Sequence, residues 1–239
     1  MIIEPAPELR EAALNALRAE YQMDEQRPGM HQSELGYCLT KSYWRRVDPL
    51  PPTDREVGLW AIGFSMERVL LSRETTPEPL VVDGITLSLD TIDLFGPADL
   101  KTTRMSPEGK SGGCAICGEV RKDHSKDHKY EAGEKTGFEF PDGWKKQFAA
   151  YCYGMGIESF GVIVVHLIQP EVTAWRITFT HNELVANWEW MLDRSNHLES
   201  MLAAGDPQPF RHNEDWECKS CVYYTRCGLE ASLRRFAIE

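Results

Sequence analysis

Apolar residues recur along the chain with two different periods, which divide it into expected helices and strands. Spacings of three and four residues predict amphipathic helices at 5–22, 33–47, 54–74, 142–155 and 181–204. Runs of β-branched and large apolar residues predict strands at 81–90, 98–101, 160–168 and 172–179. The last two strands should pair side by side. The turn signal Phe95-Gly96-Pro97 predicts that the first two form a hairpin.

The long helical segments have an apolar stripe each. In the last helix, a capping box at Thr180 and Glu183 marks the start, and Gly205 marks the end. Its stripe should be buried and consists of Leu184, Trp188, Met191, Leu198 and Met201. The stripe expected in 54–74 consists of Leu59, Ile62, Met66, Val69 and Leu70. Two polar residues within apolar segments, His166 and Cys152, are expected to be core residues.

Three charged residues gather at the expected hairpin. Asp90 ends its first strand, and alternation along the second places Asp99 and Lys101 on one face. Two carboxylates and an ammonium would thus converge, a set that suits Mg²⁺ or Mn²⁺ with a lysine to activate or orient a water. Asp93 is the alternative first acid. Asp90 is favoured because its nine-residue separation from Asp99 leaves room for a hairpin, whereas six residues hardly do.

Composition restricts the class of protein. The chain has 239 residues, 42% of them apolar, which fits one domain, 1–239, with a small insertion. There is no apolar run of about 18 residues and no secretory signal at the start, so we expect a cytoplasmic protein without a membrane span. The net charge of −11 counts against a simple nucleic-acid binder, although residues 41–46, 101–146 and 226–235 are locally basic.

Cysteine spacing indicates two metal sites rather than disulfides. The first is Cys114-x2-Cys117 followed by His124 and His128, two thiolates and two imidazoles that can hold Zn²⁺ tetrahedrally. The gap between Cys117 and His124 is too short for a ββα finger, so a zinc knuckle is expected. Linker-like flanks make residues 104–143 an inserted zinc-binding module.

The second set of cysteines lies near the carboxyl end, in region 208–239. Cys218, Cys221 and Cys227 provide three thiolates within ten residues, one short of a closed four-cysteine site. Cys38, 180 residues before Cys218, can supply the fourth. Such a set could bind either an iron–sulfur cluster or Zn²⁺.

Taken in order, these motifs resemble the PD-(D/E)XK nuclease superfamily, RecB type, from Cys38 to Cys227. Asp90, Asp99 and Lys101 match its catalytic core. The split of the cysteines resembles the iron–sulfur staple of CRISPR-associated RecB-like exonucleases and AddB helicase-nucleases. The resemblance implies a [4Fe–4S] cluster at the four cysteines. The resemblance also implies that Glu67 is a metal-binding acid on the preceding helix. It further implies that Gln147 and Tyr151 place the DNA backbone.

The fold implied by the resemblance is α/β, a restriction-endonuclease-like core with a central mixed sheet flanked by helices. The function implied is metal-dependent hydrolysis of DNA, with single-stranded DNA as the preferred substrate and exonuclease action. One alternative is a DNA endonuclease or nickase with the same chemistry. The other is a non-catalytic DNA-binding assembly subunit in CRISPR adaptation or phage recombination. The intact acids and lysine favour an enzyme.

Overall fold

The computed structural model describes residues 5–20, 29–70, 78–89, 96–109, 116, 137–207, 215–219 and 221–228. Its helices are α1 (Pro7–Glu20), α2 (Gln32–Leu35), α3 (Leu39–Val47), α4 (Asp54–Leu70), α5 (Asp142–Met155), α6 (His181–Ala204) and α7 (Asp215–Lys219). Its strands are β1 (Met30–His31), β2 (Leu80–Val82), β3 (Ile85–Leu87), β4 (Ala98–Thr103), β5 (Ser159–His166) and β6 (Glu171–Thr178). Within these ranges no helix is both long enough and apolar enough to cross a bilayer.

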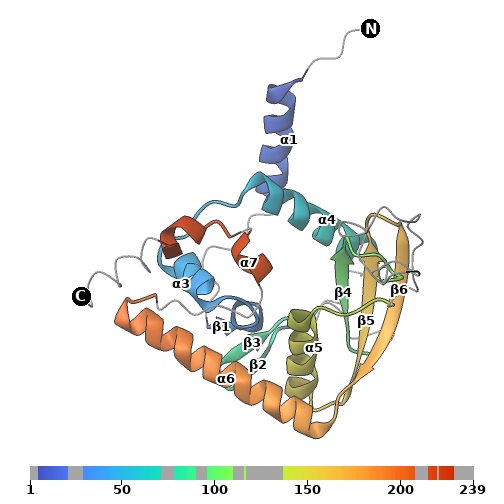
Figure 1. The fold of residues 1–239 in the computed structure, drawn as a ribbon, viewed down its shortest axis with the longest axis vertical. Helices are drawn as coiled ribbons and strands as arrows, with labels where there is room; N and C mark the ends of the chain where they lie inside the picture. Colours follow the sequence, from blue (N-terminus) through green and yellow to red (C-terminus); the bar gives the residue numbers. More distant parts are fainter. Residues whose placement is uncertain are drawn as a thin grey trace.

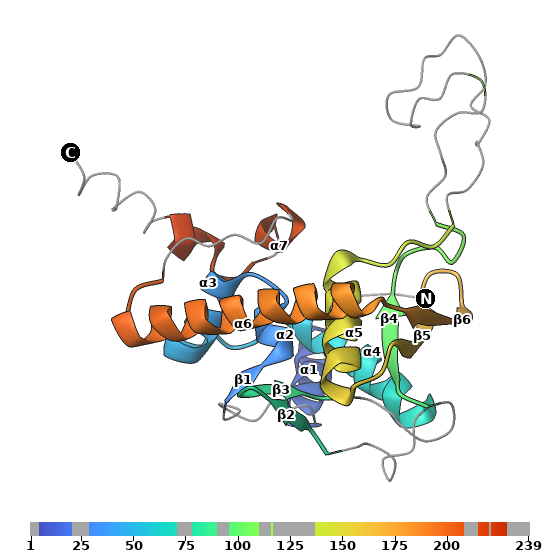
Figure 2. The same cartoon turned by 90° about the horizontal axis from the view of Figure 1, so that it is seen from below.

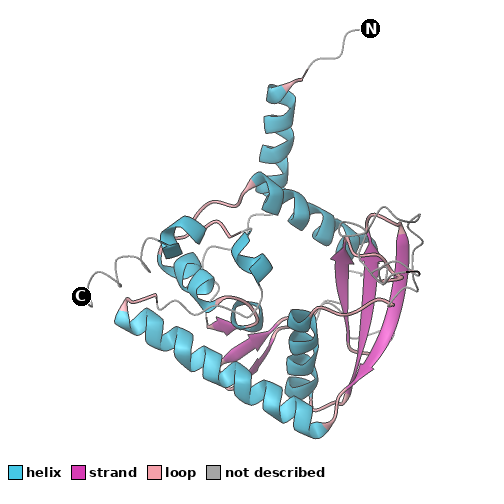
Figure 3. Cartoon of the chain, viewed as in Figure 1, coloured by secondary structure: helices cyan, strands magenta, loops and turns pink. Residues whose placement is uncertain are grey.

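The strands form two small mixed sheets with helices around them (Figure 3). In one sheet, β5 lies between β4, its parallel neighbour, and β6, its antiparallel neighbour. In the other, β3 pairs in parallel with β1 and antiparallel with β2. The α/β class is therefore confirmed, and so is the pairing of 160–168 with 172–179. The described strands form two sheets instead of a single central one.

The hairpin expected between 81–90 and 98–101 is wrong. The structure instead makes a hairpin within the first segment, where β2 turns into β3 at Asp83 and Gly84. Both residues have positive φ, 47° and 79°, as a two-residue turn between antiparallel strands requires. An Asp-Gly pair is a strong hairpin signal, and it divides the expected long strand in two. β4 pairs with β5 instead of with the first segment.

The core lies between the two sheets and the helices α5 and α6. Helix α6 contacts α5 near one end and α2 and α3 further along, so it spans the molecule (Figures 1 and 2). Its capping box at Thr180 and its left-handed end at Gly205 are present as expected. The expected stripe from Leu184 to Met201 is buried, and so are Cys152 and His166.

His166 has both ring nitrogens engaged inside the core. Nδ1 lies 2.8 Å from the carbonyl oxygen of Met105 and Nε2 lies 2.9 Å from Oγ1 of Thr173. Since a carbonyl oxygen only accepts, Nδ1 is the donating nitrogen. The expectation of a satisfied core histidine is confirmed.

Helix α4 differs from its expectation, because most of its apolar stripe is exposed, including Leu59, Ile62, Val69 and Leu70. No residue of α1 is buried either.

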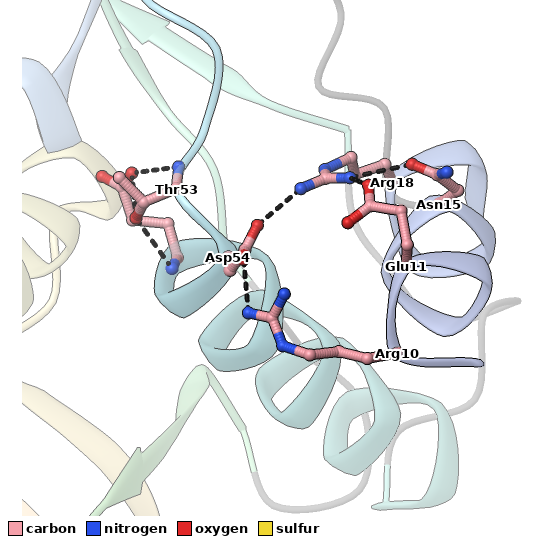
Figure 4. A network of polar contacts seen from close by, with 7 residues as sticks. Arg10, Glu11, Asn15, Arg18, Thr53 and Asp54 are labelled. Atoms are coloured by element: carbon pink, nitrogen blue, oxygen red, sulfur yellow. Dashed lines mark hydrogen bonds and ion pairs between the residues drawn. The ribbon is translucent and has the colours of Figure 1, made fainter. Parts of the chain in front are cut away.

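Arg10 and Arg18 of α1 form ion pairs with Asp54 at the start of α4 (Figure 4). A hydrogen bond from Arg10, aided by Arg18, lowers the pKa of the Asp54 carboxyl against the opposing effect of desolvation.

Close packing of α5 on the β2–β3 hairpin explains Gly154. A Cβ atom on this residue would lie 2.4 Å from Cδ1 of Leu87 and 3.2 Å from Cδ2 of Leu80. Leu87 is fully buried and cannot move aside into solvent. The glycine therefore allows the helix to approach the hairpin.

We expect Gly154→Ala to lower the free energy of unfolding by about 1–2 kcal/mol, because overpacking of about 1–3 kcal/mol outweighs the helix propensity gained by alanine. The matched control is Gly58→Ala in α4, where a Cβ meets nothing within 4 Å. That change should leave stability unchanged or raise it by up to about 1 kcal/mol. Urea unfolding of both variants measures the difference, and equal stabilisation by both would contradict the packing argument.

Candidate active site

Strand β4 carries an acid and a lysine that contact each other. Asp99 and Lys101 lie opposite Val162 and Val164 of β5. Lys101 Nζ forms an ion pair with the carboxylate of Asp99, which is 1% exposed, and lies 5.8 Å from the ring centroid of Phe148 in α5. The expectation that both residues share one face is confirmed.

The pair is not an ordinary surface ion pair. Asp99 and its neighbours Ala98 and Leu100 are all buried, so this end of β4 is covered on both faces. Desolvation offsets most of the Coulombic attraction of a buried pair, which therefore contributes little to stability. A buried acid held against a lysine occurs both in structural ion pairs and at functional sites.

Glu67 lies on the element next to β4. It is half-buried in the last turn of α4, a helix that contacts β4. The structure thus places the two acids Glu67 and Asp99 on neighbouring elements. Asp90 and its alternative Asp93 lie outside the described residues, as do Cys114, Cys117, His124 and His128.

Gln147 and Tyr151 of α5 form a hydrogen-bonded pair. Gln147 Nε2 donates to the Tyr151 hydroxyl at 2.6 Å, and that hydroxyl donates to the carbonyl oxygen of Ser88 at 2.6 Å. Tyr151 is buried, whereas Gln147 is partly exposed. Tyr151 is therefore placed to hold the backbone two residues before Asp90, and Gln147 is the member of the pair that solvent reaches.

The cysteine-bearing segments from the two ends of the chain lie against each other. The backbone N–H of Cys38, the residue just before α3, donates to Glu217 Oε2 of α7 at 2.8 Å. The Tyr223 hydroxyl accepts from the backbone N–H of Leu50 at 3.0 Å. Arg226 ion-pairs with Asp48 and lies 3.4 Å from the ring centroid of Trp44. The structure thus brings the α7 segment beside α3 (Figure 1).

The four cysteine thiols in this region are of the chemical type that binds Zn²⁺ or an iron–sulfur cluster. Cys38, Cys218, Cys221 and Cys227 are partly exposed thiols, and Cys221 donates its N–H to the Cys218 carbonyl at 3.3 Å. Cys152, by contrast, is fully buried, and burial raises the pKa of its thiol to about 11, which keeps it protonated. Among the described residues, no three His, Cys, Asp or Glu side chains are gathered closely enough to hold a metal ion. A four-thiolate site would therefore require these cysteines to come closer together than they lie here.

Sequence reasoning missed Arg194, which is buried in α6. Its guanidinium donates to the backbone carbonyls of Leu35 and Tyr37 and lies 4.7 Å from the ring centroid of Trp190. Burial lowers the pKa of Arg194 to about 10, against the opposing charges of Cys38 and Glu217, so the group stays cationic at neutral pH.

A signal for Arg194 is nonetheless present in the sequence. The buried stripe of α6 passes through Leu184, Trp188, Met191 and Leu198. Its spacing of three and four residues calls for a buried side chain at 194 or 195, between Met191 and Leu198. A charged residue on an otherwise apolar helix face requires a specific partner inside the protein.

Comparisons with known proteins find a distant structural likeness. No family model matches the chain, and no curated protein matches its sequence. Among solved structures, the fold is similar to the crystal structure of SSO0001, with 14% sequence identity, a TM-score of 0.49, and coverage of 91% of this chain and 95% of that chain.

Proposed function

We propose that the protein is a metal-dependent DNA nuclease of the PD-(D/E)XK type, acting on single-stranded DNA as an exonuclease. The observation that carries the proposal is the contact between the buried Asp99 and the partly exposed Lys101 on one face of β4. An acid and a lysine two residues apart on a strand, next to a helix with a second acid, are the residues that this chemistry needs. The preference for single-stranded ends comes from the sequence resemblance.

Each residue of the site has a distinct role in this proposal. Asp99, Glu67 and Asp90 would hold Mg²⁺ or Mn²⁺, which polarises the scissile phosphate when bound. Lys101, held against Asp99, keeps an ammonium beside the acid and orients the attacking water. Tyr151 holds the Ser88 carbonyl and thereby the chain that leads to Asp90. Gln147 would contact the DNA backbone, since it is the partly exposed member of its pair.

Two further metal sites belong to the proposal. Cys38, Cys218, Cys221 and Cys227 would hold a [4Fe–4S] cluster, with Zn²⁺ as the alternative at the same thiolates. The hydrogen bond between Cys38 and Glu217 supports this, because it joins the segments that carry the first cysteine and the last three. Zn²⁺ held by Cys114, Cys117, His124 and His128 would organise the inserted module.

The experiment that tests the activity uses the full chain with end-labelled DNA and Mg²⁺ or Mn²⁺. Degradation of linear single strands, with circular single strands left intact, is the expected result. Cutting of circular single strands would indicate an endonuclease or nickase instead. Binding of DNA without cleavage under every metal condition would contradict the proposal and favour an assembly subunit.

The zinc module can be tested by deletion, because the chain on its two sides meets at Gly109 and Gly137. Gly137 donates its N–H to the Glu108 carbonyl at 3.1 Å. Boundaries beyond these two glycines would remove Phe138 and Phe140, which contact the ring of Trp175. Residues 110–136 are therefore the segment to remove.

We expect the protein lacking 110–136, joined by a short glycine linker, to fold with a melting temperature within about 4 °C of the full chain, equivalent to about 1 kcal/mol. It should contain about one equivalent of zinc less, since four ligands make one structural site. Zinc analysis of a Cys114→Ser/Cys117→Ser variant of the full chain is the matched control. Unchanged zinc in both proteins would exclude the site.

A further inference from the structure

We propose that Arg194 and Glu217 are positioning residues for the four-cysteine metal centre, both holding the peptide group that leads into Cys38, and that Arg194 also offsets the negative charge of the centre. The inference rests on the proposed metal centre and is independent of the proposed nuclease activity. It starts from one peptide group, the one that joins Tyr37 to Cys38.

This peptide group is held at both of its polar atoms by charged side chains. Its carbonyl oxygen, from Tyr37, accepts a hydrogen bond from Arg194 of α6. Its N–H, from Cys38, donates to the Glu217 carboxylate of α7 at 2.8 Å. In a trans peptide these two groups point in opposite directions, so the two contacts together fix the plane of the group. The Cα atom of Cys38 is held with it, which limits where this residue can present its thiol.

The backbone of this loop is held by three hydrogen bonds from charged side chains, two from Arg194 and one to Glu217. The Arg194 fork makes a second bond, to the carbonyl of Leu35, so one guanidinium spans the loop between α2 and α3. Hydrogen bonds with a charged partner are about twice as strong as neutral ones. Trp190, which lies against the guanidinium and against Lys146 Nζ at 3.9 Å, limits its movement.

Charge provides the second part of the argument. Four thiolates outnumber the positive charge of Zn²⁺ or of an oxidised iron–sulfur core, so the centre is an anion in either case. A partly buried anion is costly unless a cation lies near it. Arg194 is buried and bonds the carbonyl of Tyr37, the residue before Cys38, while Glu217 bonds the N–H on the other side of the same peptide group. Glu217 acts in the opposite direction, because it adds a negative charge beside the centre.

The test uses the full chain, purified and loaded without oxygen, with three variants at the two positions. Arg194→Gln removes the charge, Arg194→Lys keeps the charge but loses the fork, and Glu217→Gln removes a negative charge but keeps an acceptor for the Cys38 N–H. The matched control is Arg46→Gln. Arg46 is on α3 itself and bonds the Gly29 carbonyl and Glu34, so the same charge is lost without touching the Cys38 peptide.

Two quantities are measured: the rate at which the metal is lost to a chelator, and, for an iron–sulfur cluster, its reduction potential. We expect Arg194→Gln to release metal about tenfold faster or more, as the loss of supporting groups around metal ligands does, and Arg194→Lys to lie in between. At a fixed solution potential, Arg194→Gln should lower the ratio of reduced to oxidised cluster about tenfold, or about 59 mV for one electron. Glu217→Gln should raise the ratio.

Opposite shifts from the two positions separate positioning and charge balance from a general loss of stability, which would act in one direction. Should Arg194→Gln fail to fold, Arg194→Lys and Glu217→Gln still decide the matter by release rate and potential. If the centre holds zinc, the release rate decides alone.

Release rates and potentials no different from those of Arg46→Gln would overturn the inference. Wild-type protein with neither iron nor zinc at the four cysteines would overturn the centre and the inference together. A protein that cleaves no DNA but shows the expected shifts would remove the nuclease proposal only.

Discussion

DNA cleavage is expected to fall about a thousandfold or more when Asp99 becomes Asn or Lys101 becomes Met, since each loss removes several kcal/mol of stabilisation from the reaction. Asp99→Asn takes away a metal-binding carboxylate while preserving the shape of the side chain. Lys101→Met takes away the ammonium that the proposal assigns to the attacking water. The initial rate of release of labelled nucleotide with saturating Mn²⁺ measures both effects.

Stability must be separated from catalysis in these variants, because Lys101→Met leaves the buried carboxylate of Asp99 without its opposite charge. Such a loss costs about 3–5 kcal/mol when the pair is deeply buried. The double variant Asp99→Asn/Lys101→Met removes both charges and serves as the control, since it should be inactive yet as stable as the wild type. Near-wild-type cleavage by the double variant would exclude this site. A comparison of Asp90→Asn with Asp93→Asn decides which residue is the first acid.

The second large effect is expected at Cys38. Replacing it by alanine should release the metal centre and lower the free energy of unfolding by on the order of 3 kcal/mol or more, about 10 °C in melting temperature. Two causes act together: the metal loses a ligand, and the link that closes the long loop from residue 38 to residue 218 is lost with it. Anaerobic wild-type protein should be brown with a broad absorption near ~400 nm, and the variant colourless.

Cys152→Ala is the matched control, because Cys152 is buried in α5 and lies outside the proposed set. It should keep its colour and metal while losing only the packing of a small core side chain. A colourless wild type with zinc at the four cysteines would replace the cluster by a zinc centre. A Cys38→Ala protein with unchanged metal and stability would be incompatible with the four-ligand assignment.

Local signals in the sequence were sufficient for much of the fold. The periodicity of 142–155 predicted α5 to the residue, and the capping box at Thr180 with the glycine at 205 predicted both ends of α6. Strand alternation was enough to place Asp99 and Lys101 on one face, because this relation depends on two residues of the same strand. These features follow from neighbours in the chain.

Features that depend on distant contacts were not predictable in the same way. The helix expected from Ser33 onward is two helices, α2 and α3, separated near Gly36. The break lies where Arg194 and Glu217 hold the loop through its backbone, and both residues are more than 150 positions away in the sequence. The hydroxyl of Tyr151 is likewise engaged by the Ser88 carbonyl, a contact that no helical pattern reveals.

The attachment of α1 has a consequence for how the protein behaves in different buffers. Arg10 and Arg18 are held to Asp54 by exposed ion pairs, and added salt screens such pairs as the Debye length falls from about 10 Å at 0.1 M to about 3 Å at 1 M. Sulfate and phosphate salts at the same time strengthen contacts between apolar surfaces. Helix α4, beside α1, already exposes Leu59 and Val69. Concentrated sulfate would therefore weaken the ion pairs that hold α1 to α4 and at the same time favour self-association through the exposed Leu59 and Val69.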